Sequence, residues 1–426
     1  MPPHVVTMTE SKVRESDLLP LELWDIVLSH VGCETRTLLD CSLVCRTWLP
    51  MARKYRFMAV NLFSKISPEM PPPNSPLLLC DPSSTILPYV RCIRLVEGLV
   101  PKSLVDRLTT NSPADMGKFG GLAWLDDILP TIRVDDLTAL RYLDLLEIRW
   151  DELTAASRTS LKRLCRNVTM LQHFSSSTIQ AGGSVLAVEL LLASPSLRVF
   201  TFESSENSDG LNLAPPQRPL NVALYSNMPK VTPPLTRLSV KGHLGEVLAG
   251  LQLVCPKMPL EDLTLAKITQ EDEGLAISFA QSCADTLTNL SLEYEKMDAP
   301  VYEPAICFND GISGLTSLRA FTLKVHLQHI PSILRHIQSR DLKHLTLETS
   351  ARTLSASDLD DLAHVLTTGV LATARPNVTI ICFPLRDIRS DAAAMADMSN
   401  KLATSLKDLE KEGRLDILWP IPRPRV

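Results

Sequence analysis

The 426-residue sequence lacks the long apolar segments and the basic excess that mark two large classes of protein. No run of 18 apolar residues is present, so we expect no transmembrane helix and no membrane partner. The first 17 residues contain no apolar core of a secretory signal, so we expect a protein of the cytoplasm, the nucleus or both. The net charge is -5, which argues against a nucleic-acid partner, because such proteins carry a basic surface that neutralises phosphates.

The sequence also lacks a regular cysteine pattern. None of the ten cysteines belongs to a C-x-x-C pair, and most lie within apolar stretches that resemble helices or strands. This distribution favours reduced thiols that serve as small core residues over a disulfide framework or a metal site. The ten are Cys33, Cys41, Cys45, Cys80, Cys92, Cys165, Cys255, Cys283, Cys307 and Cys382.

Motifs for catalysis or cofactor binding are missing as well. The segment "MGKFGG" (116–121) has glycines and a lysine, but not in the order of a phosphate-binding loop. The histidines of "HLQH" (326–329) have no carboxylate or cysteine at ligand spacing, so we expect surface or turn histidines there. No Ser/His/Asp or Cys/His set stands out. We therefore predict no enzymatic activity, no catalytic residue, no metal and no cofactor.

What is present begins with two short apolar segments, "LPLELWDIVLSHV" (19–31) and "LLDCSLVCRTW" (38–48). Pro20 suits the first turn of a helix, where its missing N–H costs nothing, and Gly32 ends that helix. Apolar residues recur at helical spacing in both segments, but Leu39 and Leu43 lie off the stripe of the second. A unit of roughly 40 residues cannot bury so much apolar surface alone, which predicts docking onto another protein. The alternative is that these helices simply cap a larger fold.

The order of these residues resembles the F-box motif, L-P-x-E-L and I-L-S-x-L followed by D-L-L-x-x-x-L-V-C-x-x-W. The resemblance covers the chain from Asp17 to about Leu62, and it departs from the family at Thr37 and in the loop "GCETRT". It implies binding to the Skp adaptor of cullin–RING ubiquitin ligases and, through the adaptor, to a cullin. The residues that the resemblance assigns to adaptor binding are Leu19, Pro20, Glu22, Leu23, Val27, Leu28, Leu38, Leu39, Leu43, Val44, Cys45 and Trp48.

The remainder of the chain carries a repeat, L-x-x-L-x-L, with helix-like stretches between the copies. Eight copies begin at residues 140, 171, 197, 235, 260, 287, 318 and 342, and the copy at 171 is degenerate. The intervals of 24 to 38 residues are typical of leucine-rich repeats, whose strands stack into a curved parallel sheet. The asparagine or cysteine that usually follows the last leucine is missing, which predicts irregular repeats.

The sequence thus predicts an α/β fold, with a three-helix F-box followed by a leucine-rich-repeat solenoid. The solenoid has a parallel β-sheet on its concave face and helices outside. The expected ranges are a disordered N-terminus (1–16), the F-box (17–62), a proline-rich linker (63–85) and the repeat domain (86–426). That domain ends in a capping helix at about 390–412 and a last strand in "RLDILWP". This combination resembles the large F-box families of fungi.

Side chains alternate along a strand, so positions 4 and 6 of each repeat face the core and positions 3, 5 and 7 face the concave side. Position 5 is serine or threonine in six of seven copies, and both signs of charge flank it. Mixed charges favour a protein or peptide partner. The alternative is that small hydroxyl residues merely fit a crowded sheet face. The candidate substrate-binding residues are Arg237, Ser239, Lys241, Asp262, Thr264, Asn289, Ser291, Glu293, Thr322, Lys324, His344 and Thr346.

These features favour a substrate receptor of a Skp–cullin–F-box ubiquitin ligase. The front helices would hold the adaptor, and the repeats would hold an unknown protein substrate near the ubiquitin-conjugating enzyme. One alternative is a scaffold that uses the adaptor without ubiquitin transfer, or a plain leucine-rich-repeat interaction protein. Another is an enzyme whose site lies in a loop that carries no known motif.

Overall fold

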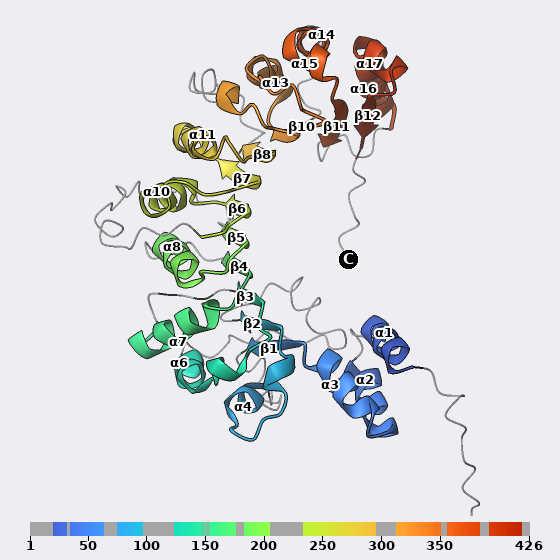
Figure 1. The fold of residues 1–426 in the computed structure, drawn as a ribbon. Helices are drawn as coiled ribbons and strands as arrows, with labels where there is room; N and C mark the ends of the chain where they lie inside the picture. Colours follow the sequence, from blue (N-terminus) through green and yellow to red (C-terminus); the bar gives the residue numbers. More distant parts are fainter. Residues whose placement is uncertain are drawn as a thin grey trace, which may run out of the picture.

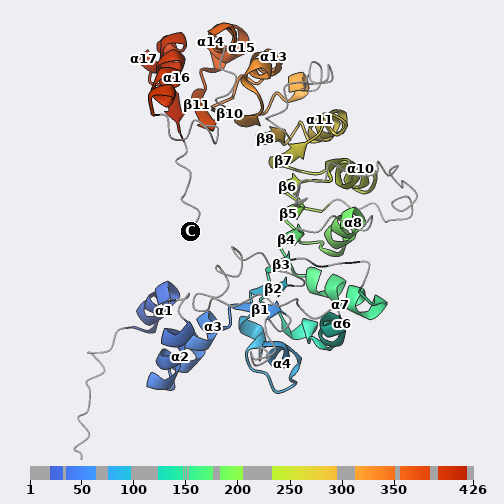
Figure 2. The same ribbon diagram turned by 180° about the vertical axis from the view of Figure 1, so that it is seen from behind.

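The computed structural model describes residues 20–31, 35–63, 75–96, 123–146, 148, 150, 153–175, 183–204, 233–294, 312–350, 356–383 and 392–419. The chain forms a curved arc, with strands along its inner side and helices along its outer side (Figure 1). The view from behind shows the front helices at one end of the arc and the C-terminal helices at the other (Figure 2).

Three helices open the described part of the chain: α1 (Leu21–Val31), α2 (Thr35–Val44) and α3 (Trp48–Arg56). Each contributes one buried residue to a small common core, namely Leu28, Leu38 and Ala52. The rings of Trp24 and Trp48 add a contact between α1 and α3, with their centroids 4.4 Å apart. So few buried residues stabilise the unit only modestly, because a fully buried leucine contributes roughly 1.5–3 kcal/mol.

The described residues contain one parallel sheet of 12 strands, in which the spatial order of the strands follows the chain. Each strand therefore contacts only the repeats before and after it, as in a solenoid. The strands are β1 (Ala59–Phe63), β2 (Cys92–Val96), β3 (Tyr142–Leu146), β4 (Met170–Ser175), β5 (Val199–Ser204), β6 (Arg237–Lys241), β7 (Asp262–Ile268), β8 (Asn289–Tyr294), β9 (Ala320–Lys324), β10 (His344–Ser350), β11 (Asn377–Phe383) and β12 (Leu415–Leu418).

Helices and short 3-10 turns connect the strands on the outer side of the arc (Figure 1). The α/β fold class and the parallel sheet are thereby confirmed. The connecting helices are α4 (Ser75–Cys80), α6 (Ala123–Ile128), α7 (Ala155–Cys165), α8 (Gly183–Ala193), α10 (Leu244–Val254), α11 (Glu273–Ser282), α13 (Ile330–Leu334), α14 (Ala356–Thr367), α15 (Gly369–Ala374), α16 (Ala392–Ser405) and α17 (Lys407–Lys411). The 3-10 turns are η2 (Leu87–Tyr89), η3 (Leu129–Thr131), η4 (Val134–Asp136), η6 (Ile312–Gly314) and η7 (Leu327–His329).

The core of the solenoid consists of the apolar residues at positions 4 and 6 of each repeat. Burial alternates along β6, β8 and β9, so every second side chain points away from solvent. These buried side chains belong to one hydrophobic cluster that runs through the whole sheet. A single repeat exposes this apolar surface on both sides, so its strand and helix are stabilised only by stacking on neighbours.

The register of β4 corrects the repeat that we placed at residue 171. Leu171 pairs with Leu143 and Phe200, so it occupies position 4 rather than position 1. The true first position is the buried Val168, and position 6 is His173. The first positions 140, 168 and 197 are therefore 28 and 29 residues apart. The regular spacing is not apparent in the sequence because position 6 of this repeat is His173 instead of leucine.

His173 is fully buried, and its ring stacks on that of Phe202 with centroids 5.3 Å apart. Burial lowers the pKa of His173 from 6.5 to about 4, and neither ring nitrogen has a hydrogen-bond partner among the described residues. Because the unfolded chain binds this proton more readily, stability should fall as pH drops from 6.5 towards 4.

We expect His173→Leu to raise the free energy of unfolding at pH 7 by about 1–2 kcal/mol and to reduce the acid sensitivity. Urea denaturation at pH 5 and pH 7 checks this, and equal pH dependence in both proteins would contradict it.

The sheet starts earlier than the predicted repeat boundary at residue 86. Strand β1 (Ala59–Phe63) falls at the end of the predicted F-box range 17–62, yet it pairs in parallel with β2. The predicted linker 63–85 contains α4, whose Leu79 belongs to the core of the solenoid. The sequence missed both elements because this first repeat has Phe57, not leucine, at position 1 and because α4 lies in a proline-rich stretch.

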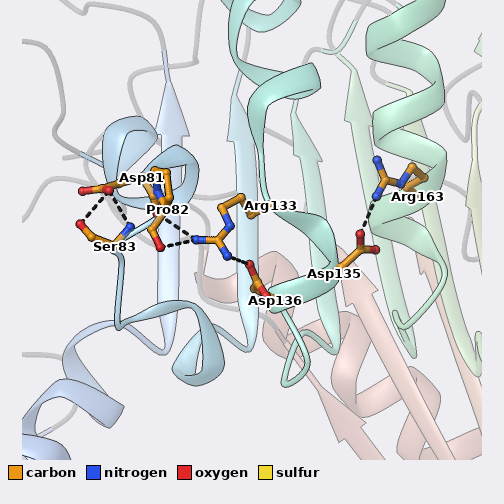
Figure 3. Close-up of polar contacts among 7 residues, drawn as sticks. All are labelled: Asp81, Pro82, Ser83, Arg133, Asp135, Asp136 and Arg163. Atoms are coloured by element: carbon orange, nitrogen blue, oxygen red, sulfur yellow. Dashed lines mark hydrogen bonds and ion pairs between the residues drawn. The ribbon is translucent and has the colours of Figure 1, made fainter.

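Side-chain contacts hold the end of the predicted linker on the solenoid (Figure 3). Arg133 donates from Nη1 to the backbone carbonyl of Pro82 at 2.5 Å and forms an ion pair with Asp136 at 2.5 Å. Arg163 of α7 forms a further ion pair with Asp135 of η4 at 2.9 Å. Residues 81–83 therefore form part of the first repeats rather than a free spacer.

The C-terminal end of the solenoid agrees with the prediction in outline. The helix expected at about 390–412 is two helices, α16 and α17, with Leu406 between them. Leu402, Leu406 and Leu409 are buried and belong to the main core. The predicted last strand is present as β12, which pairs in parallel with β11.

Candidate functional site

The first candidate surface is a group of exposed apolar side chains on α1 and α2, which we call the front apolar surface. It contains seven of the eleven large apolar residues that are exposed in the described part of the chain. The most exposed are Leu43 and Val44, at 78% and 64%. Soluble monomers seldom expose so many apolar groups on one small unit, so this surface is suited to docking. Its members are Leu21, Leu23, Ile26, Val27, Leu39, Leu43 and Val44.

The residues assigned to adaptor binding fall into three groups. Pro20, Glu22, Leu23, Val27, Leu39, Leu43, Val44 and Cys45 are exposed. Leu28 and Leu38 lie in the core of the helical unit, and Trp48 is half-buried against Trp24, so these three support the surface from behind. Leu19 lies outside the described residues. Two exposed members of the front apolar surface, Leu21 and Ile26, were not assigned from the sequence.

The second candidate surface is the concave face of the sheet, where the predicted residues stand in three columns. The hydroxyl residues at position 5 pair across successive strands and form an unbroken column. All twelve predicted residues are exposed or half-buried, as the alternation of side chains requires. The column also continues into two threonines that were not assigned, Thr201 of β5 and Thr379 of β11.

Ion pairs between neighbouring strands neutralise most of the charges on the concave face. Arg237 lies 3.0 Å from Asp262, and Lys241 lies 2.5 Å from Glu203. Lys324 forms an ion pair with Glu293, and its ammonium group also lies 5.7 Å from the ring centre of Phe383. Exposed pairs of this kind contribute little to stability. Their consequence is that the concave face offers hydrogen-bonding groups without a strong net field.

At the N-terminal end of the concave face, position 5 holds a buried, paired carboxylate instead of an accessible hydroxyl group. At position 5 of β3, Asp144 is only 4% exposed and pairs with Arg94 of β2 at 2.6 Å. Burial raises the pKa of Asp144, and the hydrogen bond and charge of Arg94 oppose this rise. Beside this pair, the Tyr142 hydroxyl donates to Oε1 of Gln172 at 2.7 Å. These four side chains bond to one another rather than to a ligand, so the accessible column of hydroxyl groups begins at β5.

The described residues offer no obvious reactive or metal-binding group. The eight described cysteines are free thiols, and burial raises the pKa of the Cys165 and Cys382 thiols to about 12. His326 and His329 are buried, so their predicted surface position is wrong, although His326 caps the 3-10 turn η7 and His329 ends it, as expected of turn histidines. The described part of the chain holds no group of three His, Cys, Asp or Glu that could bind a metal ion. Among its helices, none has the length and apolar character needed to span a bilayer.

Comparisons with known proteins add one similarity. No family model matches the chain, and no curated protein matches it. Among solved structures, the chain is similar to the leucine-rich repeat-containing protein LegL7 from Legionella pneumophila, with 15% sequence identity and a TM-score of 0.37. The similarity covers 81% of this chain and 98% of that protein. The fold assignment therefore rests on the strand register and repeat positions of this chain.

Proposed function

We propose that this protein is a non-catalytic substrate-recognition subunit of a Skp–cullin–F-box ubiquitin ligase in the cytoplasm or nucleus. The observation that carries the proposal is the front apolar surface. Its exposed members, such as Leu23, Leu43 and Val44, occupy positions that match the F-box motif. Leu28 and Leu38 meanwhile form the internal core of the same helices. Burial of this surface against the Skp adaptor would remove a large apolar area from water.

The repeats would supply the substrate site. The concave face offers a continuous column of serine and threonine hydroxyls between columns of paired charges. Such a surface can form many hydrogen bonds with a protein or peptide while its own charges stay compensated. The protein would then act by proximity, because holding a substrate lysine near the charged conjugating enzyme raises its effective concentration.

The proposal is tested by reconstitution from purified components. The full chain, mixed with the Skp adaptor and a cullin, should elute from a sizing column as one complex containing all three. Binding to the adaptor without recruitment of the cullin would favour the scaffold alternative. Failure to bind the adaptor at all would contradict the proposal and leave a leucine-rich-repeat interaction protein.

The concave face should be needed for substrate capture. We expect Thr264→Arg with Ser291→Arg to block the centre of the hydroxyl column and to reduce captured substrates by about tenfold or more, as loss of a central contact often does. Proximity labelling under proteasome inhibition, compared between the variant and the wild type, measures this.

The matched control introduces two arginines on the outer side, by Asp360→Arg with Asp361→Arg in α14, where both residues are exposed. Lys162 and Arg163 would be poorer controls, because they pair with Glu189 and Asp135. If the α14 variant loses the labelled proteins and the concave variant keeps them, the substrate site lies on the helices instead.

A further inference from the structure

A row of exposed arginines lies at the turns that precede β2, β3, β4 and β5. Its members, which we call the rim arginines, are Arg91, Arg141, Arg166 and Arg198. The backbone fixes their spacing, because Arg141 donates its N–H to the carbonyl of Arg91 at 2.9 Å. Thr169 in turn donates to Arg141 at 2.8 Å, and Arg198 donates to Thr169 at 2.9 Å. Arg91, Arg141 and Arg198 thus occupy equivalent places, whereas the turn before β4 contributes Arg166, which caps α7 three residues before Thr169.

Unlike the charges of the concave face, the rim arginines are not compensated by described acidic residues. None of them forms an ion pair with another residue in the described ranges. Arg141 donates from Nη1 to the carbonyls of Thr138 and Leu140, at 3.1 and 2.7 Å. Arg91 lies near Asp25 of α1, whose carboxylate is already paired with Lys54.

The surrounding turns keep this part of the rim positive. Asp135 and Asp136, which precede β3, are paired with Arg163 and Arg133. The turns 165–169 and 194–198 contain no acidic residue. The row ends before β6, where Thr236 occupies the equivalent place, and the exposed Glu261 follows before β7. The row of four arginines covers β2–β5, at the end of the arc that carries α1–α3 (Figure 1), and exposed basic residues return at the equivalent places before β9 and β10 as Arg319 and Lys343.

We propose that the rim arginines bind an extended acidic segment of a protein partner through its aspartate and glutamate carboxylates. Parallel strands lie about 4.8 Å apart, so the row spans about 14 Å from Arg91 to Arg198. In an extended peptide, acidic residues at positions i, i+2 and i+4 span about 13 Å, because alternate side chains lie roughly 6.7 Å apart. Arginine matches this ligand well, since its planar guanidinium group forms paired hydrogen bonds with a carboxylate.

A protein partner fits this row better than a nucleic acid does. Nucleic-acid binding rests on neutralising many phosphates with basic residues, whereas the row offers four arginines and the chain carries a net charge of -5. The inference rests on the protein-interaction role of the repeats proposed above, but not on adaptor binding. The rim arginines would form a second binding surface, separate from the concave face, and their ligand would be an acidic protein segment.

The test uses the purified full chain and a fluorescein-labelled peptide in which glutamate alternates with serine. Fluorescence anisotropy at about 150 mM salt should show binding, and the matching glutamine–serine peptide should not bind. Arg166→Ala with Arg198→Ala should weaken binding of the glutamate peptide by at least about tenfold. The matched control, Arg319→Ala with Lys343→Ala, changes the equivalent exposed places before β9 and β10 and should bind like the wild type.

Three results would overturn the proposal: no binding of the glutamate peptide by the wild type, equal weakening in both double variants, or tighter binding of a single-stranded RNA of similar length. Thermal denaturation of each variant shows whether a loss of binding reflects unfolding. The purified peptide assay contains no adaptor, so its failure is distinguishable from failure of the proposed ligase role. In that role, the Arg166 and Arg198 variant should still co-purify with the adaptor.

Discussion

Replacement of Leu43 and Val44 by aspartate is expected to abolish binding of the Skp adaptor while the repeats stay folded. Both side chains are largely exposed, so the change removes little from the core of the chain itself. In the complex they would be buried, and a buried unpaired carboxylate is strongly unfavourable. At central hot-spot positions, the loss of each apolar side chain costs about 2 kcal/mol or more, so the two together should weaken binding by roughly a thousandfold. Isothermal titration of the purified chain with the adaptor measures this.

The matched control is Leu253→Asp in α10, another exposed leucine, which lies on the outer side of the solenoid. This variant should bind the adaptor with wild-type affinity, because its position is far along the chain from the front helices. If the Leu43 and Val44 variant also keeps wild-type affinity, the front apolar surface is not the adaptor site. In that case the F-box assignment fails, whatever the repeats bind.

Arg94→Met is expected to have the largest effect on stability, lowering the free energy of unfolding at pH 7 by about 3–5 kcal/mol. The change leaves the carboxylate of Asp144 buried without its ion-pair partner. Burial already raises the pKa of Asp144, and loss of Arg94 should raise it further. A carboxyl group with a raised folded pKa is protonated in the native state at low pH. The destabilisation should therefore be small near pH 4, grow as pH rises from the ordinary value of 3.8 towards the raised folded pKa, and level off above it.

Urea denaturation at about pH 4, pH 5.5 and pH 7 follows this dependence. The second variant combines Arg94→Met with Asp144→Asn, which removes both charges. Stability at pH 7 should then recover in large part, since replacing both members of a buried pair costs far less than removing one. An unchanged stability in the single variant, or a loss that is equally large at low pH, would show that the pair does not hold β2 and β3 together.

The sequence predicts the adaptor-binding candidates and the repeats wherever the spacing of apolar residues along the chain is sufficient to identify them. Leu39 and Leu43 lie off the apolar stripe of their helix, which is a local observation, and the structure shows both exposed. Likewise, L-x-x-L-x-L places Leu263 and Leu265 in the core and Thr264 on the concave side, because side chains alternate along any strand. These predictions needed only neighbours within a few residues.

Predictions failed where a residue broke the local pattern. His173 stands at a leucine position, so the copy at Leu171 was placed three residues out of register. Strand β1 was missed because its repeat begins with Phe57, and α4 was missed because it lies in a proline-rich stretch. In each case, pairing with a well-formed neighbouring repeat supplies the stabilisation that the local sequence lacks.

The sequence by itself determined the repeat period, the alternation of buried and exposed positions and the exposed apolar character of the front helices. Only the tertiary structure decided which charges meet. Arg237 and Asp262 are 25 residues apart, and Arg94 and Asp144 are 50 apart, yet each pair lies on adjacent strands. The same stacking gathers the rim arginines, from Arg91 to Arg198, into one row. The physical reason is that a parallel sheet places residues from successive repeats about 4.8 Å apart, and no local period along the chain encodes that contact.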